Sequence, residues 1–333
     1  MEKGTWHPGA LLTTSGFYWQ TCTLHAGVKL DIFTTIGNSR ITATEIAARL
    51  QADPRATAML LDALAAMGLL EKTADAFANT HEGLTWLSRD SADYIGYIIL
   101  HHHNLVASWS KLDEAVRSGR PVRQRANFQD PEIRRNFLLG MFNLAMSTAP
   151  RVVPMADLAG RKNLLDLGGG PGTYAIHFCK HNPGLRAAVF DLPTTRPFAL
   201  ETIERFGLGG RIDFVSGDYL TDEIPQGHDV VWLSHILHGE GPGECEALIA
   251  KAVAALAPGG LILVHDFILD DTRDRPLFPA LFSLNMLLGT EGGQSYTETE
   301  ITAMLENVGV GSIRRLHVKT PNDSDVLMGV KGG

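Results

Sequence analysis

Two patterns of hydrophobic and polar positions follow one another along this chain of 333 residues. Up to about residue 149, apolar residues recur at helical spacing, and capping motifs separate the repeats. Beyond about residue 161, short apolar runs alternate with helical segments, which is typical of a wound parallel sheet. The segment 150–161 holds two prolines and a charged end, so it predicts a boundary between domains 1–150 and 151–333.

The first domain is predicted to be mainly helical, with helices over 11–36, 43–50, 54–68, 91–117 and 130–149. Within it, Thr42-Ala-Thr-Glu45 forms a capping box, and Asp53-Pro54 supplies an N-cap followed by a proline at the first helical position. Two short extended pieces, 69–73 and 76–80, come after these helices. Helix, turn, helix and hairpin together predict a winged helix.

The second domain predicts strands joined by helices, near 163–167, 186–191, 212–216, 229–234, 260–267, 311–318 and 324–330. No helical pattern separates the last two strands, so we expect them to pair as an antiparallel hairpin across Thr320-Pro-Asn-Asp-Ser324. The predicted fold class is α/β. It is a Rossmann-like, seven-stranded, mostly parallel sheet with an antiparallel hairpin at its end, preceded by the mainly α-helical winged-helix domain.

A glycine-rich loop follows the first strand of the second domain, in Asn163-Leu-Leu-Asp-Leu-Gly-Gly-Gly-Pro-Gly-Thr173. Such a loop between a strand and a helix lets the backbone approach a ligand, usually a nucleotide. The pattern departs from a dinucleotide fingerprint, because Thr173 holds the place of the third glycine. Asp166 would also repel a pyrophosphate. The loop therefore favours a ligand that carries positive charge and no phosphate, such as S-adenosyl-L-methionine.

Aspartates follow three successive strands of this domain. Asp166 opens the glycine loop, Asp191 ends the second strand and Asp218 follows the third. In open α/β sheets ligands bind at the carboxyl ends of the strands. Asp191 can accept both ribose hydroxyls and Asp218 the adenine amino group, with Leu192 or Tyr219 against the ring. Each aspartate alone could cap a helix, but all three in register indicate a nucleoside site.

Composition and charge exclude other classes of function. The formal net charge of −8 argues against a nucleic-acid partner, and the second winged-helix helix carries only Arg55 as a basic residue. No apolar run is long enough to span a membrane, and no signal peptide precedes the first helix. The widely spaced cysteines 22, 179 and 245 indicate reduced thiols, and we expect a cytoplasmic protein.

These motifs resemble those of class I S-adenosylmethionine-dependent methyltransferases, and specifically the plant-type and hydroxyindole-type small-molecule O-methyltransferases. The matching elements, in order, are Asp191-Leu-Pro193, Gly217-Asp218, Leu233-Ser-His-Ile-Leu-His238, Pro258-Gly-Gly260 and Glu291-Gly-Gly293. The resemblance spans nearly the whole chain. It implies S-adenosyl-L-methionine as cofactor, S-adenosyl-L-homocysteine as product, and a homodimer formed through the N-terminal domain, which also covers the substrate pocket.

The resemblance also implies a catalytic pair. His238 stands where the family has its general base, with His235 one helical turn before it as the competitor. Asp266 matches an acid that orients the base, shortened from glutamate. The family's second acid is replaced by Ser295, so Glu291 is left as a possible substitute, and Gly239-Glu240 replaces the usual Asp-Trp.

Two sets of binding residues are predicted, and no metal is expected. The cofactor-binding residues are Asp166, Gly168, Gly170, Asp191, Leu192, Gly217, Asp218, Tyr219, Ser234 and His235. The substrate-pocket residues are His103, Phe142, Met146, Phe282, Met286 and Glu291. Three consecutive histidines, 101–103, point about 100° apart on a helix, so they cannot converge on one metal ion. The apolar first helix is either core or a subunit interface.

The sequence therefore predicts an enzyme that moves a methyl group from S-adenosyl-L-methionine to a hydroxyl of a small aromatic molecule. Two alternatives stay open: a member of the same fold that binds the cofactor and catalyses another reaction, and a winged-helix regulator that senses the cofactor. The sequence does not name the acceptor molecule, and it leaves open whether the accepting atom is oxygen, nitrogen or sulfur.

Overall fold

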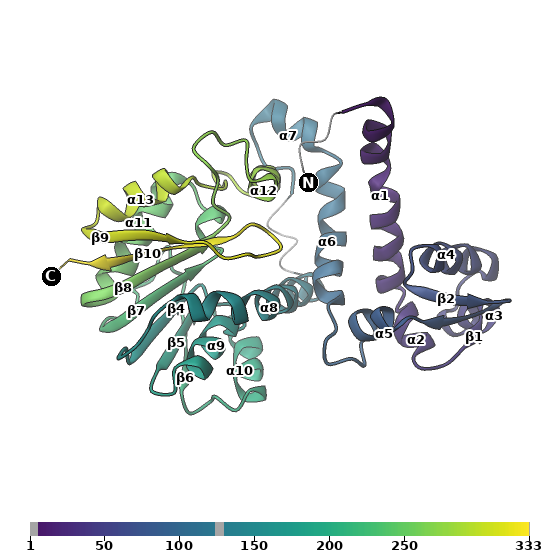
Figure 1. Cartoon of the computed structure of the whole chain (residues 1–333), viewed down its shortest axis with the longest axis horizontal. Helices are drawn as coiled ribbons and strands as arrows, with labels where there is room; N and C mark the ends of the chain where they lie inside the picture. Colours follow the sequence, from purple (N-terminus) through teal and green to yellow (C-terminus); the bar gives the residue numbers. More distant parts are fainter. Residues whose placement is uncertain (1–5, 124–129, 333) are drawn as a thin grey trace. The chain divides into compact units, whose positions relative to one another are not determined.

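The structure, a computed structural model, describes residues 6–123 and 130–332 and divides into two units (Figure 1). The first unit comprises the chain up to Leu105 together with Arg135–Asn143, and the second comprises the rest. The division therefore falls inside α8 (Pro131–Val152), which runs through Pro150. The predicted domains 1–150 and 151–333 stay a prediction.

The first unit contains the predicted winged helix. Its elements are α1 (Pro8–Lys29), α2 (Ile32–Ile36), β1 (Ile41–Thr42), α3 (Ala43–Leu50), α4 (Pro54–Ala66), β2 (Leu70–Thr73), β3 (Ala76–Asn79) and α5 (His81–Leu87). The three strands form a small antiparallel sheet in the order β1-β3-β2. Phe33, Leu61 and Phe77 are fully buried in its core. The capping box at Thr42 and the N-cap at Asp53 are both formed, as the sequence predicts.

Two of the long helices predicted from the sequence are broken. The expected helix over 11–36 is interrupted at Asp31, which adopts a left-handed conformation with φ +57° and accepts a hydrogen bond from Thr34 Oγ1 at 2.7 Å. The expected helix over 91–117 is split into α6 (Gly96–Trp109) and α7 (Leu112–Ser118). There, Ser110 Oγ donates to the Ala107 carbonyl oxygen at 2.9 Å, and such local bonds compete with the helix.

The second unit contains a seven-stranded sheet in the order β6-β5-β4-β7-β8-β10-β9. The strands are β4 (Asn163–Leu167), β5 (Arg186–Asp191), β6 (Ile212–Ser216), β7 (His228–Ser234), β8 (Leu256–Asp266), β9 (Val310–Leu316) and β10 (Asp325–Lys331). Neighbouring strands are parallel except β10, which runs antiparallel to both β8 and β9. The α/β fold class and the terminal hairpin are thus confirmed.

Helices cover both faces of this sheet (Figure 1). The helical elements are α9 (Thr173–His181), α10 (Arg196–Arg205), α11 (Pro242–Ala255), α12 (Leu277–Gly289) and α13 (Glu298–Glu306), with the 3-10 turns η2 (Val153–Met155) and η3 (Leu237–Gly239). On one face α9 and α10 pack around the fully buried Trp232, and on the other α11 and α13 pack against Val231 and Leu233. Because both faces are covered, the strands are almost continuously apolar.

The carboxyl ends of β4, β5, β7 and β8 meet at one edge of the sheet, where Asp166, Asp191, Ser234 and Asp266 lie. None of the helices in the described ranges combines the length and the apolar character that a membrane span requires.

Candidate active site

The glycine loop encloses the carboxylate of Asp166. This side chain projects from the buried end of β4, and its Oδ2 accepts a hydrogen bond from the backbone N–H of Ala175 at 3.1 Å. A Cβ on Gly169 would lie 2.6 Å from the carboxyl carbon, closer than real contacts allow. The sequence pattern predicted roles for Gly168 and Gly170. The structure adds Gly169, whose missing side chain is what lets the loop pass over Asp166.

Asp166 is buried with one oxygen unpaired. Its Oδ1 has no hydrogen-bond partner within the described residues, and the residue is only 1% exposed. Burial, with a smaller effect from the charge of Asp191, raises the pKa of Asp166 to about 7. A buried carboxylate is stabilised when a cation approaches it. The site therefore fits a ligand with a positively charged group, such as the sulfonium or amino group of S-adenosyl-L-methionine.

Asp191 connects the glycine loop to the end of β5. Its Oδ2 accepts from the Gly170 N–H at 2.8 Å, and its Oδ1 accepts from the Leu192 N–H at 2.7 Å. Burial raises the pKa of this carboxyl group. Each carboxylate oxygen can accept a further hydrogen bond, so Asp191 can still bind ligand hydroxyls. The neighbouring Leu192 side chain is 46% exposed and free to cover a ligand.

The loop after β6 is fixed by a contact that the sequence analysis did not predict. Tyr219 donates from its hydroxyl to Glu240 Oε1 at 3.1 Å, so the loops after β6 and β7 are joined. Asp218 Oδ1 accepts from the Leu220 N–H at 2.9 Å. A Cβ on Gly217 would collide with the Phe190 ring. Glu240, which replaces a family tryptophan, therefore holds the predicted adenine side of the site.

Ser234 and His235 lie beside a buried histidine that has a partner on each ring nitrogen. His265 Nδ1 is 3.0 Å from Ser234 Oγ, and its Nε2 is 3.0 Å from Ser324 Oγ. His235 has φ +55° and packs its ring 4.4 Å from both His265 and Phe267. A non-glycine residue in the left-handed region is strained and is often found at functional sites. The predicted cofactor contacts of Ser234 and His235 stay predictions.

His238 and Asp266 form a close pair across the ends of β7 and β8. His238 Nδ1 is 2.6 Å from Asp266 Oδ1, which also accepts from the Phe267 N–H at 2.8 Å. Burial raises the pKa of Asp266, but the neighbouring His238 and His235 rings together lower it by more, so the pKa lies below its usual range. An ionised Asp266 keeps the proton on Nδ1 and leaves Nε2 free to accept one.

His235 is less well placed for that carboxylate. Its Nδ1 is 3.8 Å from Asp266 Oδ1, beyond hydrogen-bond distance. Ligand atoms of His235, His238 and Asp266 lie within 4.8 Å of one another, an arrangement that could hold a metal ion. However, two ligands of a tetrahedral zinc ion would stand about 3.3 Å apart, and the 2.6 Å between His238 and Asp266 is shorter. The geometry favours a proton-sharing pair over a metal centre.

Ser295, which stands where the family has its second acid, has a different role here. It is fully buried, and its Oγ donates to the Pro279 carbonyl oxygen at 2.9 Å, which attaches the loop to α12. Within the described ranges, Glu291 is exposed and makes no hydrogen bond or ion pair. Asp266 is thus the acid that contacts the His238 ring. The placement of Glu291 in the substrate pocket stays a prediction.

Aromatic rings surround His238. The Phe282 ring, on α12, lies edge-on to it with centroids 4.7 Å apart, and Phe267 stacks at 5.4 Å. Phe278 extends this wall, 5.9 Å from Phe282. Met286, one turn after Phe282, is 7% exposed. Phe267 was not predicted, although its position directly after Asp266 at a strand end could have indicated it.

The other predicted pocket residues are Met146, Phe142 and His103. Met146, on α8, places its sulfur 3.4 Å from His177 Nε2 on α9. Phe142 and His103 belong to the first unit. There, His103 Nε2 lies 3.0 Å from Lys29 Nζ. Their roles in substrate binding stay predictions.

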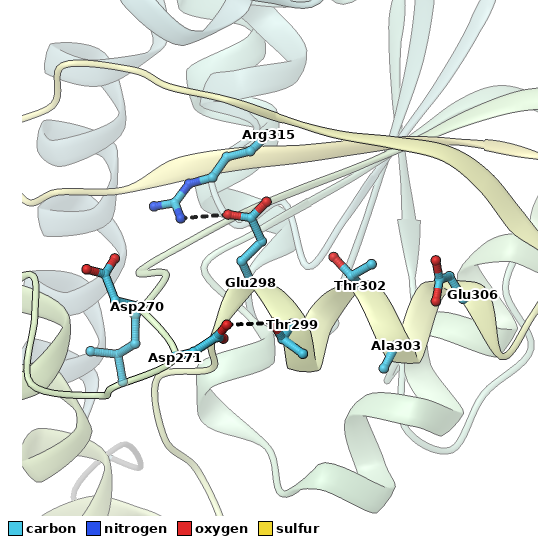
Figure 2. A pocket seen from close by; sticks show the side chains of 9 residues that line it. Asp270, Asp271, Glu298, Thr299, Thr302, Ala303, Glu306 and Arg315 are labelled. Carbon is cyan, nitrogen blue, oxygen red and sulfur yellow. Dashed lines mark hydrogen bonds and ion pairs between the residues drawn. The ribbon is translucent and has the colours of Figure 1, made fainter.

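The surface also has a hollow of about 610 Å³ beside α13 (Figure 2). Acidic side chains line it, but several already have partners: Arg315 lies 2.9 Å from Glu298, and Thr299 donates to Asp271 at 2.8 Å. The hollow contains none of the predicted site residues. We therefore place the candidate site at the strand ends and not in this hollow.

Two family models and many known proteins match this chain. Residues 109–311 match the model of the O-methyltransferase domain, and residues 12–89 match that of the O-methyltransferase dimerisation domain. A 3-hydroxy-5-methyl-1-naphthoate 3-O-methyltransferase of Streptomyces sahachiroi is 33% identical over 94% of this chain and 92% of its own length. The N,N-dimethyltransferase OxyT of Streptomyces rimosus is 30% identical over 90% of each chain.

Among solved structures, human N-acetylserotonin methyltransferase in complex with S-adenosylmethionine superposes with a TM-score of 0.88. It is 26% identical, and the match covers 100% of both chains. The cofactor of this protein is accordingly S-adenosyl-L-methionine, which agrees with the unpaired carboxylate oxygen of Asp166. The chain belongs to the family of S-adenosylmethionine-dependent O-methyltransferases that carry an N-terminal dimerisation domain.

Proposed function

We propose that this enzyme methylates a hydroxyl group of a small aromatic molecule and that His238 is its general base. The observation that carries the proposal is the 2.6 Å contact between His238 Nδ1 and Asp266 Oδ1, within a wall of aromatic rings. A paired histidine is suited to removing a proton from a hydroxyl. The rings of Phe267 and Phe282 offer flat apolar surface for an aromatic acceptor.

In this mechanism, S-adenosyl-L-methionine supplies a methyl group that is already activated by the sulfonium. Asp166 would face the positive charge of the cofactor, Asp191 would accept from its ribose hydroxyls and Asp218 from its adenine amino group. Asp266 fixes the Nδ1 proton of His238, and Nε2 takes the proton of the acceptor hydroxyl as the oxygen is methylated. The remaining work of the protein is alignment, because the displacement needs donor and acceptor in line.

The names of two relatives differ in the atom that accepts the methyl group. One is named as a 3-O-methyltransferase of a hydroxynaphthoate and another as an N,N-dimethyltransferase. A hydroxyl must lose its proton during transfer, whereas a neutral amine can attack before it is deprotonated. The close His238–Asp266 pair therefore supports oxygen as the acceptor.

Methyl transfer to matched hydroxyl and amine acceptors tests this proposal. Purified protein is given the cofactor with a panel of naphthols, hydroxynaphthoates and aminonaphthalenes, and release of S-adenosyl-L-homocysteine is followed. We expect a hydroxyl acceptor to react, and His238→Ala to lower its rate roughly 10²–10⁴-fold, the size of general-base catalysis.

The matched control is His81→Ala, because His81 is an exposed histidine in the first unit. The proposal fails if amines are the better acceptors and His238→Ala transfers methyl as fast as the control.

We further propose that two copies associate through the N-terminal domain. The match to a dimerisation domain over 12–89 supports this, as do the exposed apolar side chains of α1. Trp19 is 68% exposed and Tyr18 61%, although such large side chains are normally buried.

A further inference from the structure

Arg123 is a half-buried cation in the second unit that lies against the end of α12. Its backbone N–H donates to the Leu288 carbonyl oxygen at 2.9 Å. Its guanidinium lies over Gly289, where a Cβ would collide with it. The Nη1 atom is buried and has no hydrogen-bond partner among residues 6–123 and 130–332. The chain thus holds a guanidinium nitrogen away from water without giving it an acceptor.

The face of α12 under Arg123 is the face that reaches the catalytic pair. Phe282, Met286 and Gly289 are spaced by four and three residues, so they share one face of the helix. Phe282 lies 4.7 Å from the His238 ring by centroids. Seven helical residues rise roughly 10 Å, which sets the distance along the helix from Phe282 to Gly289.

A second set of contacts also brings this helix end close to His238. Thr290 follows Gly289 and accepts a hydrogen bond from the Gly293 N–H at 3.0 Å. A Cβ on Gly293 would lie only 2.5 Å from the His238 carbonyl oxygen. Arg123 therefore lies against the end of the same helix whose Phe282 ring faces His238.

A purely structural role does not account for the unpaired nitrogen. A cation near the end of a helix is favourable for the helix dipole. However, Nη1 donates to none of the carbonyl groups at this helix end. Burial lowers the pKa of Arg123, which means that burial destabilises its charge. On the same face, Asn285 Oδ1 is also buried without a partner within the described residues. Arg123 Nη1 and Asn285 Oδ1 can therefore each form a hydrogen bond with a polar ligand.

We propose that Arg123 binds a carboxylate carried by the aromatic acceptor, at the opposite end from the hydroxyl that is methylated. The inference rests on the proposed function and adds the substrate class: aromatic hydroxy acids of about two fused rings. A guanidinium presents parallel N–H donors that match the two oxygens of a carboxylate. The partly buried position strengthens that pairing, because less water competes for it.

Equilibrium binding tests this assignment without requiring turnover. A hydroxynaphthoate and the corresponding carboxamide, which share one shape and differ in charge, are titrated into protein saturated with S-adenosyl-L-homocysteine. We expect the wild-type protein to bind the acid more tightly. In Arg123→Met, the preference for the acid over the amide should fall roughly 10- to 100-fold, the loss expected for hydrogen bonds between charged groups.

Two further variants separate recognition from folding. Arg120→Met removes an exposed arginine of the same segment and should keep the wild-type preference. Gly289→Ala keeps the charge but displaces the guanidinium, and alanine is the better helix former, so this variant should lose the preference without losing thermal stability.

Three outcomes would overturn the proposal. They are a wild-type protein without preference for the acid, an unchanged preference in Arg123→Met, and equal weakening of both ligands together with a lower melting temperature. The methyl-transfer panel is scored separately, so failure of the proposed function is recognised by absent transfer to every hydroxyl acceptor, whatever the binding preference.

Discussion

The carboxylate of Asp166 shows how one residue couples stability to cofactor binding. Its Oδ1 is buried without a partner, and burial raises its pKa to about 7. An ionised group in this position destabilises the folded chain, because no solvent or cation balances its charge. Protonation or a bound cation removes that cost. The ligand-free protein should therefore respond to pH in a way that the cofactor-bound protein does not.

We predict that the ligand-free protein loses stability as pH rises from about 4 to about 7. Asp166 binds a proton more tightly in the folded chain than in the unfolded chain, so its contribution is complete at low pH and is lost as pH passes the folded pKa. The loss amounts to about 2–4 kcal/mol. Thermal unfolding of wild-type protein and Asp166→Asn, measured from about pH 5 to pH 8, should show the variant gaining relative stability.

The control for this measurement is Asp75→Asn, which changes an exposed carboxylate in the turn between β2 and β3. It should follow the wild-type curve. A constant difference between Asp166→Asn and wild type across the range would contradict the assigned pKa. Binding of S-adenosyl-L-methionine to Asp166→Asn should also be weaker, because the positive ligand loses its counter-charge.

Asp266→Asn should disable the base while leaving its position intact. An amide can donate to His238 Nδ1, which would move the ring proton to Nε2, where the acceptor hydroxyl must be deprotonated. We expect kcat for a hydroxyl acceptor to fall about 10²-fold or more, with the KM of the cofactor little changed. Single-turnover rates measure the chemical step directly. A variant that keeps wild-type rates would show that Asp266 does not set the tautomer.

The family resemblance named His238 and Asp266, and the structure gives the physical reason for their proximity. His238 follows β7 and Asp266 ends β8, which are neighbouring parallel strands. Contacts that depend on the path of a loop could not be predicted. The hydrogen bond from Tyr219 to Glu240 joins two loops. The hydrophobic pattern of the sequence does not predict the shape of either loop. Arg123 likewise stands in a segment without a motif, 166 residues before Gly289.

At the scale of elements, the turn from β4 into α9 depends on the absence of one side chain. Gly169 passes over Asp166 at a distance that leaves no room for a Cβ. The preceding strand is ordinary and has its predicted bounds, and the following helix begins at Thr173. In the loop between them, the close approach to Asp166 restricts position 169 to glycine.

Gly169→Ala should therefore weaken cofactor binding more than it weakens the fold. The added methyl must displace the loop or the Asp166 carboxylate, at a cost typical of overpacking, about 1–3 kcal/mol. We expect the affinity for S-adenosyl-L-methionine to fall at least about 10-fold, measured by calorimetry. Gly243→Ala is the matched control, because that glycine lies in the first turn of α11 with open space around it. Equal affinities of the two variants would contradict this account.

The sequence predicted the elements of the sheet better than the long helices. Strands β4, β5 and β6 have their predicted bounds, because short runs of apolar residues between polar turns mark each of them. The helix over 11–36 was extended too far, since the left-handed Asp31 that divides it interrupts no apolar repeat. A break of this kind is decided by local bonds such as that from Thr34 to Asp31. The spacing of hydrophobic residues does not predict such a break.

For the molecule as a whole, the surface of α1 predicts association of two copies. Leu12, Tyr18 and Trp19 are each more than 60% exposed. Covering such side chains is worth roughly 1.5–3 kcal/mol for each large one that becomes fully buried. We expect light scattering to give twice the chain mass of 36.2 kDa for the wild-type protein, and Trp19→Glu to shift it toward the single-chain mass.

The control for the association test is Trp86→Glu, because Trp86 is a partly exposed tryptophan on α5, outside α1. It should leave the mass unchanged. Wild-type protein at the single-chain mass over a wide concentration range would contradict the predicted homodimer.

Strand β10 lies between β8 and β9 although the ribosome makes it after both. Its Asp325 stands opposite Asp266, and Ser324 approaches the buried His265. The edge of β8, which carries Asp266, is therefore open until the hairpin has emerged. Unpaired strand edges invite wrong pairing. Translation that stalls before residue 324 would thus yield a chain that is prone to wrong pairing and becomes a client for chaperones and proteases.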